Sequence, residues 1–298
     1  MSEKYLVFHV EGGLGKNIAS TAVAAALKKE HPDRKLIVVA SWPEVYLNNP
    51  IADRVYRVGI APYFYDDYIK GKDTIVLRKE PYFENDHMMK NTPLHHTWFN
   101  MYDLEYDPKV HKPSLPMNMM QASYISQWKR NKPTLLIHTN GGPFDQAQQP
   151  HSYSWTRDMP TPIAQEVVRR LSGKYHIFQL CRQNSFIIQG AETINKPMSN
   201  YELFALLCST DKRLLIDSCM QHAAAAYNLK STVLWVGTSP DMFGYKLHTN
   251  IQAKAPSNVV KNIDGYLFDY DFNGHLHQCP FSDANKMFNP DEVIKTLL

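Results

Sequence analysis

Glu11 to Lys16, with the sequence EGGLGK, form a glycine-rich turn between an apolar run and a helical pattern, and such turns can hold phosphate groups. A nucleoside triphosphate loop also needs a glycine five positions before the Gly-Lys pair, and a Ser or Thr after the pair to hold magnesium. Val10 and Asn17 occupy these two positions. The dinucleotide fingerprint fails as well, because Ile18 replaces its third glycine and the second strand pattern ends in Ala-Ser-Trp without an acidic residue.

The three glycines of this turn are Gly12, Gly13 and Gly15. Glycine tolerates a positive φ angle and the close approach of another backbone, and a helix start attracts negative charge. The turn is therefore predicted to face a phosphate group or an acceptor. A tight strand-to-helix turn without a ligand is the alternative.

A second turn begins at Asp217, where an apolar strand pattern stops and an Ala-rich helix pattern opens. The N–H groups of Ser218, Cys219 and Met220 have no intrahelical partners at such a helix start, so we expect them to bind a diphosphate. Asp217 would repel phosphate and is expected to face sugar hydroxyls. The alternative is that Asp217 or Ser218 caps the helix.

Bulk properties indicate an ordinary globular protein. The chain of 298 residues suggests two domains of about 150 residues each. It is 44% hydrophobic and 20% charged, with a net charge of +3, which implies no strongly charged partner. Four dispersed cysteines, without metal or disulfide spacing, favour reduced thiols in a cytoplasm. Without a signal peptide pattern or a long apolar run, we expect a soluble protein with no stable membrane insertion.

Strand and helix signals alternate along the chain, which favours parallel sheets covered by helices. We expect strands at 5–10, 35–40, 54–58, 74–77, 134–138, 175–180, 213–216 and 232–236, and helices at 18–29, 119–128, 162–171, 201–208 and 220–227. The charged stretch at 129–133 contains a proline and is interpreted as a linker. The prediction is an α/β fold with two Rossmann-like βαβ domains, residues 1–130 and 131–298, that face a cleft. An aromatic-rich insertion at 80–127 belongs to the first domain.

Taken together, these motifs resemble the heptosyltransferase-like glycosyltransferases of the GT-B fold. The family's pattern of Asp, Ser or Thr, Gly, two variable residues and His, before an Ala-rich helix and a Gly-Pro-Thr type loop, is matched by residues 217–222 and 237–240. In the first half, the glycine turn and the run Asn49 to Val58 are also similar to the family. The resemblance covers about residues 5–58 and 134–245. No counterpart is assigned to the aromatic segment.

The resemblance implies that the second domain binds a nucleotide sugar and that the first presents an acceptor hydroxyl. It also implies transfer without a metal or another cofactor, so helix ends and cations must stabilise the leaving diphosphate. Gln179 and Arg182 are candidates for the ribose and the base, with surface residues as the alternative. The candidate donor-binding residues are Thr139, Asn140, Gly141, Arg157, Gln179, Arg182, Asp217, Ser218, Cys219, Met220 and His222.

Two positions depart from the family pattern. Lys16 stands where the family commonly has an Asp proposed as the catalytic base, and a charged lysine cannot take a proton. We therefore expect Glu11 to be the base, with Lys16 contacting phosphate or an anionic acceptor and Asp217 as the third catalytic candidate. Cys219 replaces a Gly and adds a side chain where the diphosphate would approach.

Three functions remain open on sequence alone. The first is a glycosyltransferase, the second a catalytically silent nucleotide-sugar-binding protein, and the third a phosphate-loop nucleotidase or kinase. Relatives of this fold modify lipopolysaccharide cores, and similar phage-encoded enzymes glycosylate hydroxymethylated DNA bases in the host cytoplasm. We therefore expect an acidic acceptor, either an anionic glycan or a DNA base approached by basic and aromatic side chains of the first domain.

Further clusters are interpreted as structural. The aromatic-rich segment contains His87, His95, His96 and His111, which lack zinc spacing and are expected to be packing or surface residues. The runs Tyr63 to Tyr68 and Trp98 to Phe99 are expected to form the core of an insertion, with stacking on a sugar or a nucleobase as the alternative. The sequence gives no oligomeric state.

Overall fold

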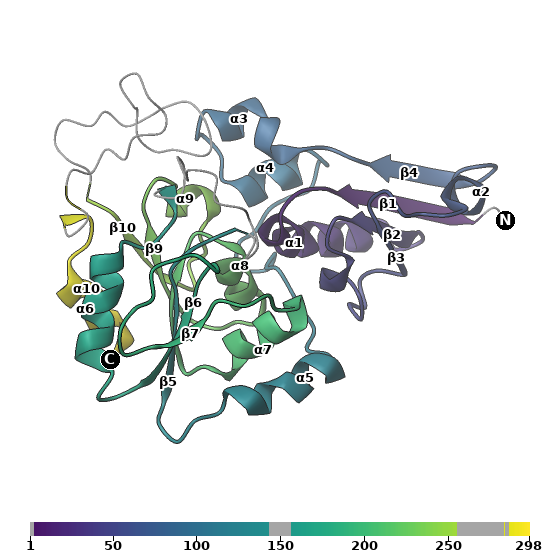
Figure 1. Ribbon diagram of the computed structural model, residues 1–298. Coiled ribbons are helices and arrows are strands. Elements are labelled where there is room, and N and C mark those ends of the chain that lie inside the picture. The colour runs from purple at the N-terminus through teal and green to yellow at the C-terminus, as the bar shows by residue number, and fades with distance from the viewer. Residues whose placement is uncertain (1–2, 143–155, 255–282, 284–285) are drawn as a thin grey trace.

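The computed structural model describes residues 3–142, 156–254, 283 and 286–298. Its strands form two parallel sheets, one of four strands and one of six. The four-stranded sheet has the order β3-β2-β1-β4 and the six-stranded sheet the order β10-β9-β8-β5-β6-β7. Figure 1 shows the two sheets as separate bodies with helices packed around each. The predicted α/β class with two Rossmann-like sheets is confirmed.

The first sheet is built from strands whose residues are largely apolar. Strands β1 and β2 pair in parallel, from Tyr5 opposite Lys35 to Val10 opposite Ala40. The elements of this half are β1 (Lys4–Val10), α1 (Leu14–Glu30), β2 (Lys35–Ala40), η1 (Pro43–Val45), β3 (Arg54–Arg57), α2 (Phe64–Tyr68), β4 (Asp73–Leu77), η2 (Pro81–Phe83), α3 (Asn85–Met88) and α4 (Leu94–Asn100).

The second sheet follows the same alternation. Its central strand β5 is buried along its whole length, as expected for a parallel strand covered on both faces. The elements are α5 (Met119–Ile125), η3 (Ser126–Trp128), β5 (Thr134–His138), α6 (Thr161–Leu171), β6 (His176–Leu180), β7 (Glu192–Ile194), α7 (Asn200–Ser209), β8 (Lys212–Ile216), α8 (Cys219–Ala226), β9 (Thr232–Trp235), α9 (Pro240–Phe243), β10 (Thr249–Gln252) and α10 (Pro290–Leu297).

Helix α1 lies at the contact between the two halves of the molecule. Its sequence is rich in alanine, and residues 16–24 are all buried, so α1 behaves as an internal helix. Helix α8, with the sequence CMQHAAAA, packs against it. Because both helices carry small side chains, their backbones approach closely.

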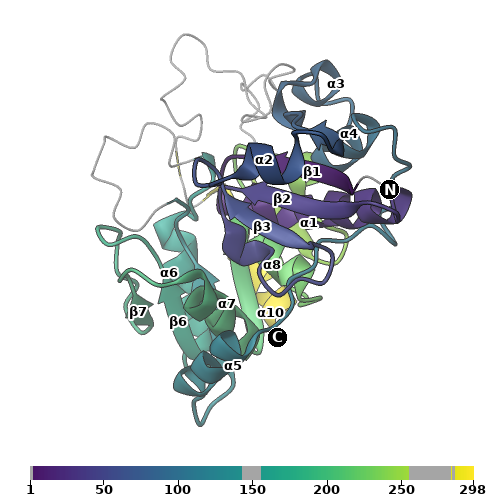
Figure 2. The same ribbon diagram turned by 90° about the vertical axis from the view of Figure 1, so that its right-hand side faces the viewer.

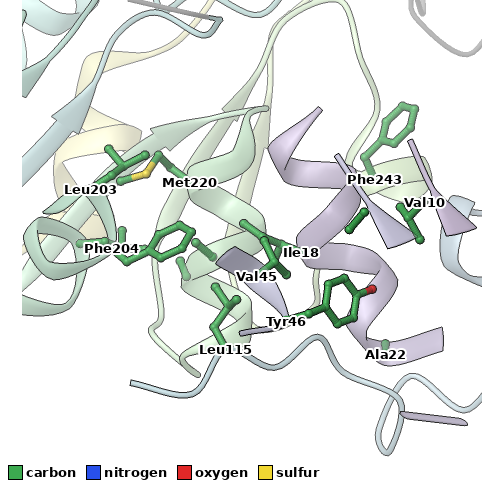
Figure 3. Packing of buried hydrophobic residues seen from close by; sticks show 14 of the residues in the cluster. Val10, Ile18, Ala22, Val45, Tyr46, Leu115, Leu203, Phe204, Met220 and Phe243 are labelled. Carbon is green, nitrogen blue, oxygen red and sulfur yellow. The ribbon is translucent and has the colours of Figure 1, made fainter. Parts of the chain in front are cut away.

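One apolar core runs across this junction. Figure 3 shows Ile18 and Tyr46 from the first half in one cluster with Leu203, Phe204 and Met220 from the second. These side chains are at most 7% exposed. Apolar burial of this kind favours a fixed relation between the two sheets over an open arrangement.

Helix α5 packs against α7 of the second half. The hydroxyl of Tyr227, just after α8, donates to Gln121 of α5 at 2.8 Å. Figure 2 shows α5 and α7 side by side at one end of the molecule. The domain boundary near residue 131 stays a prediction.

Part of the aromatic-rich segment forms core. Trp98 and Phe99 are 1% and 0% exposed, which confirms their expected place in the core of the insertion. Tyr63 and Tyr65, in the earlier aromatic run, are 79% and 64% exposed, so the expected core position is wrong for these two side chains. Within the described ranges, no helix combines the length and apolar character needed to cross a membrane.

Candidate functional site

The strand orders create one topological switch point in each sheet. In the first sheet, chain order reverses between β1 and β4, and in the second between β5 and β8. Ligands of open α/β sheets bind in the crevice outside the carboxyl ends of strands at such points. The glycine turn at 11–15 follows β1, and the turn at 217–219 follows β8. Both predicted turns therefore lie at switch points.

Ser218 caps helix α8. Its Oγ accepts a hydrogen bond from the N–H of Met220 at 3.2 Å, so the capping alternative holds for Ser218. The same Oγ lies 3.1 Å from Nδ1 of His138 at the end of β5. Burial lowers the pKa of His138 to about 4, so its imidazole is neutral at physiological pH. The amide of Met220 is already bonded, and its buried side chain belongs to the core cluster.

Asp217 is buried beside the first turn of α8. Its Oδ2 accepts a hydrogen bond from the hydroxyl of Thr238 at 2.8 Å. Burial raises the pKa of the Asp217 carboxyl, and the positive charge of Arg157 acts against this rise. Burial likewise raises the pKa of Cys219 to about 11, again opposed by Arg157. The exposed Arg157 thus places its field on the turn where a diphosphate is expected.

The loop after β5 is bonded to Asp158. The carboxylate of Asp158 accepts hydrogen bonds from the Asn140 side chain at 3.0 Å and from the Gly141 N–H at 3.2 Å. Arg182 donates to the same carboxylate at 2.5 Å. A Cβ atom built on Gly141 would lie 3.9–4.0 Å from Ile216 and Ser218, so this loop lies against the α8 turn. The charge of Arg182 is therefore largely compensated by Asp158.

Thr139 and Gln179 are both buried and bonded within the protein. The Thr139 hydroxyl donates to Asn140 at 2.9 Å. Gln179 donates to the carbonyl of Phe186 at 2.7 Å and accepts from the N–H of Ile188 at 2.8 Å. These bonds fix the loop after β6. The structure thus gives Gln179 a loop-positioning role, and contact with ribose or base stays a prediction.

Glycine is required at two positions of the first turn for different geometric reasons. Gly12 has φ of +104°, a conformation that other residues rarely adopt. Gly15 faces the second half of the molecule, because a Cβ at Gly15 would lie 2.8 Å from Cδ2 of His222 and 3.3 Å from Cα of Cys219. Gly13, the N-cap of α1, has open space around its missing Cβ. Gly15 therefore allows the two candidate turns to touch.

We expect Gly15→Ala to destabilise the protein by about 1–3 kcal/mol, because the added methyl group overpacks the α1–α8 contact. Urea unfolding of Gly15→Ala measures this cost. Gly13→Ala is the matched control, with a loss below about 1 kcal/mol expected from the changed helix cap alone. Equal stability of the two variants would show that the α1–α8 approach does not depend on Gly15.

Glu11 lies at the carboxyl end of β1 with an exposed side chain. One carboxylate oxygen accepts a hydrogen bond from Arg78 at 2.7 Å and lies 3.5 Å from Nε2 of His9. Burial lowers the pKa of His9, and the charge of Arg78 lowers it further, while Glu11 acts in the opposite direction. Glu11 thus lies at the switch point of the first sheet in an ion pair with Arg78, and its role as the catalytic base stays a prediction.

Lys16 is held inside the first half of the molecule. Its side chain is 8% exposed and forms an ion pair with Glu80. The ammonium also lies 5.4 Å from the ring centre of Tyr82 and 5.8 Å from that of Trp98. Because a carboxylate and two aromatic rings already surround this ammonium, the structure does not favour its predicted contact with phosphate or acceptor.

His222 belongs to a polar cluster at the junction of the two halves. Its Nδ1 lies 2.8 Å from the Tyr245 hydroxyl, and its Nε2 lies 3.1 Å from the Gln221 amide. Burial lowers the pKa of His222 to about 3. His222 thus contacts both the donor turn and Gly15, although the sequence assigned it to the donor alone.

Within the described residues, no cluster of three His, Cys, Asp or Glu side chains could hold a metal ion. His87 and His95 are buried, in agreement with their predicted packing role. Cys181, Cys208 and Cys219 are free thiols, and Cys279 lies outside the described residues.

The sequence did not identify Asp158 and His138 as support for the candidate donor residues, and Thr238, in the matched loop 237–240, was given no partner there. His138 ends the strand pattern 134–138, and Thr238 comes two residues after the pattern 232–236, so strand ends were the signal that could have identified both. Asp158 follows Arg157 in a segment without periodicity, and only the structure shows its bonds to Asn140 and Arg182.

Comparison with known proteins finds matches among solved structures. No family model matches the sequence, and no curated protein does. ADP-heptose lipopolysaccharide heptosyltransferase II of E. coli superposes with a TM-score of 0.60 at 11% identity, over 98% of this chain and 96% of that chain. The iron-containing dodecameric glycosyltransferase TibC of enterotoxigenic E. coli gives 0.64 at 16% identity, over 96% and 74%.

A third solved structure, the E. coli heptosyltransferase WaaC with ADP, superposes with a TM-score of 0.51 at 12% identity, over 84% of this chain and 93% of that chain. At these identities the likeness concerns the fold. It confirms the resemblance predicted from the two turns and their order along the chain. The chain has the GT-B fold of the heptosyltransferases.

Proposed function

We propose that the chain is a glycosyltransferase that moves a sugar from a nucleotide-sugar donor to an acceptor hydroxyl. The observation that carries this proposal is the convergence of the loop ends 139–141, 157–158, 217–219 and 237–238 around the first turn of α8, at the switch point of the second sheet. The WaaC and TibC structures contain ADP and ADP-heptose, so an ADP-sugar is the first donor class to test.

The site residues suggest a division of roles in this reaction. The acceptor oxygen attacks the anomeric carbon, the bond from that carbon to the diphosphate breaks, and the acceptor proton passes to Glu11. Arg157 and the amides of Ser218 and Cys219 receive the charge that develops on the leaving diphosphate. Asp217, fixed by Thr238, is proposed to accept hydrogen bonds from sugar hydroxyls.

Ion pairs formed by basic side chains of the first half affect which class of acceptor can bind there. Most basic side chains that were candidates for DNA contact have carboxylate partners, which weakens a positive surface field. An anionic glycan would meet the same weakened field, so we keep both an anionic glycan and a DNA base as proposed acceptors, and binding to duplex DNA across a salt titration tests the DNA base. The pairs are Lys16 with Glu80, Arg57 with Glu44, Lys70 with Asp66, Lys72 with Glu3, and Arg78 with Glu11.

The other two functions are kept as outcomes of experiment. Turnover of a donor in the presence of acceptors would exclude a silent binding protein. A phosphate-loop nucleotidase is disfavoured, because the lysine that it needs is paired with Glu80. The free thiols of Cys181, Cys208 and Cys219 are consistent with the proposed cytoplasmic location.

We expect ADP to bind without a divalent metal. Isothermal titration of the protein with ADP should give the same Kd, within about twofold, in magnesium and in EDTA, because amides and Arg157 supply the positive potential. AMP is the matched control ligand and should bind at least about tenfold more weakly, since it lacks the second phosphate. A tenfold loss of ADP affinity in EDTA would contradict the metal-independent site.

A further inference from the structure

Residues 80–111, here called the bridging segment, contact both halves of the molecule. At its start, Glu80 forms the ion pair with Lys16, near the beginning of α1. Further along, Tyr82 stacks on Phe243 of α9 with ring centres 6.3 Å apart, and the ring of His87 meets the same phenyl ring edge-on at 5.5 Å. The segment therefore packs on helix α1 of the acceptor side and on helix α9 of the donor side.

A hydrogen-bonded chain of four side chains continues this link. Nε2 of His95 in the bridging segment lies 3.2 Å from the Tyr245 hydroxyl, and the same hydroxyl lies 2.8 Å from Nδ1 of His222 in α8. The Gln221 amide lies 3.1 Å from Nε2 of His222. These contacts give one consistent direction: Gln221 donates to His222, Nδ1–H of His222 donates to Tyr245, and Tyr245 donates to His95.

This direction requires both imidazoles to be neutral, because each accepts a hydrogen bond at Nε2. Their surroundings meet this requirement. Burial lowers the pKa of His95 to about 4 and that of His222 to about 3. Both tautomers are thereby defined, with Nδ1 protonated in His222 and Nε2 free to accept in His95.

The chain ends where the two candidate turns meet. Cδ2 of His222 would lie only 2.8 Å from a Cβ at Gly15, so this imidazole rests on the first turn of α1. His222 belongs to the first turns of α8, the helix that begins at Cys219, directly after Asp217 and Ser218. The orientation of the His222 ring thus affects how closely the glycine turn approaches the donor turn.

The position of Tyr245 is itself defined by its neighbour. Gly244 ends helix α9, and a Cβ at Gly244 would lie 2.5 Å from the carbonyl oxygen of Pro240. Only glycine allows this tight exit from the helix. The Tyr245 ring then packs against His222 at 5.5 Å and against His95 at 5.2 Å.

We propose that His95 and Tyr245 are positioning residues, which hold the donor turn of α8 at a fixed separation from the acceptor-side glycine turn through His222. The effect on sugar transfer rests on the proposed function. The structural effect does not, because it concerns the packing of α8 on α1. Positioning of this kind matters since displacement of reacting groups by about 1 Å can lower a rate a hundredfold.

Tyr245→Phe tests the structural part. This variant keeps the ring and removes both hydrogen bonds, so backbone hydrogen exchange in peptides covering 12–18 and 218–224 should accelerate at least about tenfold. Strand β5 should be unchanged. Tyr175→Phe is the matched control, because the Tyr175 hydroxyl donates to the carbonyl of Leu297 at 2.9 Å, away from the junction. Unchanged exchange in Tyr245→Phe at both turns would overturn the proposal.

A pair of variants at His95 separates hydrogen bonding from packing. His95→Gln keeps an acceptor for the Tyr245 hydroxyl, whereas His95→Leu removes it. We expect His95→Leu to lower kcat about tenfold with the donor KM within twofold, and His95→Gln to restore most of kcat. Equal kcat for the two variants would also overturn the positioning role.

The two readouts distinguish failure of this inference from failure of the proposed function. If no donor is turned over, the exchange experiment with Tyr245→Phe still decides whether the chain positions α8. In that case, loss of protection at both turns would retain the structural inference and reject the transferase.

Discussion

Arg157→Met is expected to lower the turnover of sugar transfer by about a hundred- to a thousandfold, because removal of one preorganised donor at a developing negative charge has this effect. The charge of Arg157 already acts on Asp217 and Cys219, where it opposes the rise in pKa caused by burial. In the transition state, the leaving diphosphate gains charge at this turn. Arg157 should therefore stabilise the transition state more than the bound donor.

Steady-state kinetics and ADP titration together measure this difference. The Kd for ADP should rise about tenfold, because the ground-state diphosphate also contacts the cation. This rise is smaller than the expected fall in kcat. Arg169→Met is the matched control, since Arg169 pairs with Glu166 on the exposed face of α6. A fall in kcat no larger than the rise in Kd would assign Arg157 to donor binding alone.

The strands and helices of the sheet cores followed from local pattern. The predicted strands 35–40 and 134–138 coincide with β2 and β5, because continuous apolar runs bounded by charge or proline are typical of buried parallel strands. The pattern missed β7 and β10, which are short strands at the two edges of the second sheet. Edge strands carry fewer buried side chains, so their apolar signal is weak.

The site was predictable where a turn follows a strand. Asp217, Ser218 and Gly141 gather at one switch point, because the carboxyl ends of parallel strands share one edge of a sheet. Lys16 was not predictable in this way. Its partner, Glu80, lies 64 positions away and becomes a neighbour only when the bridging segment packs on α1.

The contact made by Gly15 was also not predictable from local sequence. Its place in a glycine turn suggested a ligand, whereas its contact with His222 depends on the packing of α1 on α8. A single sequence contains no signal for the separation of two helices from different halves. The Ala-rich composition of both helices was visible, but it permits close packing without specifying a partner.

Glu11→Gln is expected to lower turnover by at least about a hundredfold, the scale of positioned proton transfer. The amide keeps the shape of the carboxylate and cannot take the acceptor proton. Donor affinity should change little, because Glu11 lies at the switch point of the first sheet and the donor turn belongs to the second. Measurement of kcat with the Kd for ADP checks both parts.

The control is Glu3→Gln, a glutamate just before the opposite end of β1 that pairs with Lys72. Near-normal turnover in Glu11→Gln would transfer the role of base to His9, whose Nε2 lies 3.5 Å from the same carboxylate. Asp66 is a poor substitute. It lies in α2, whose Tyr68 packs on Tyr5 near the amino end of β1, at the far edge of the sheet (Figure 1). A base must reach the acceptor hydroxyl within hydrogen-bond distance, so Glu11 and His9 at the carboxyl edge of the first sheet are better placed than Asp66 if the acceptor binds at that edge.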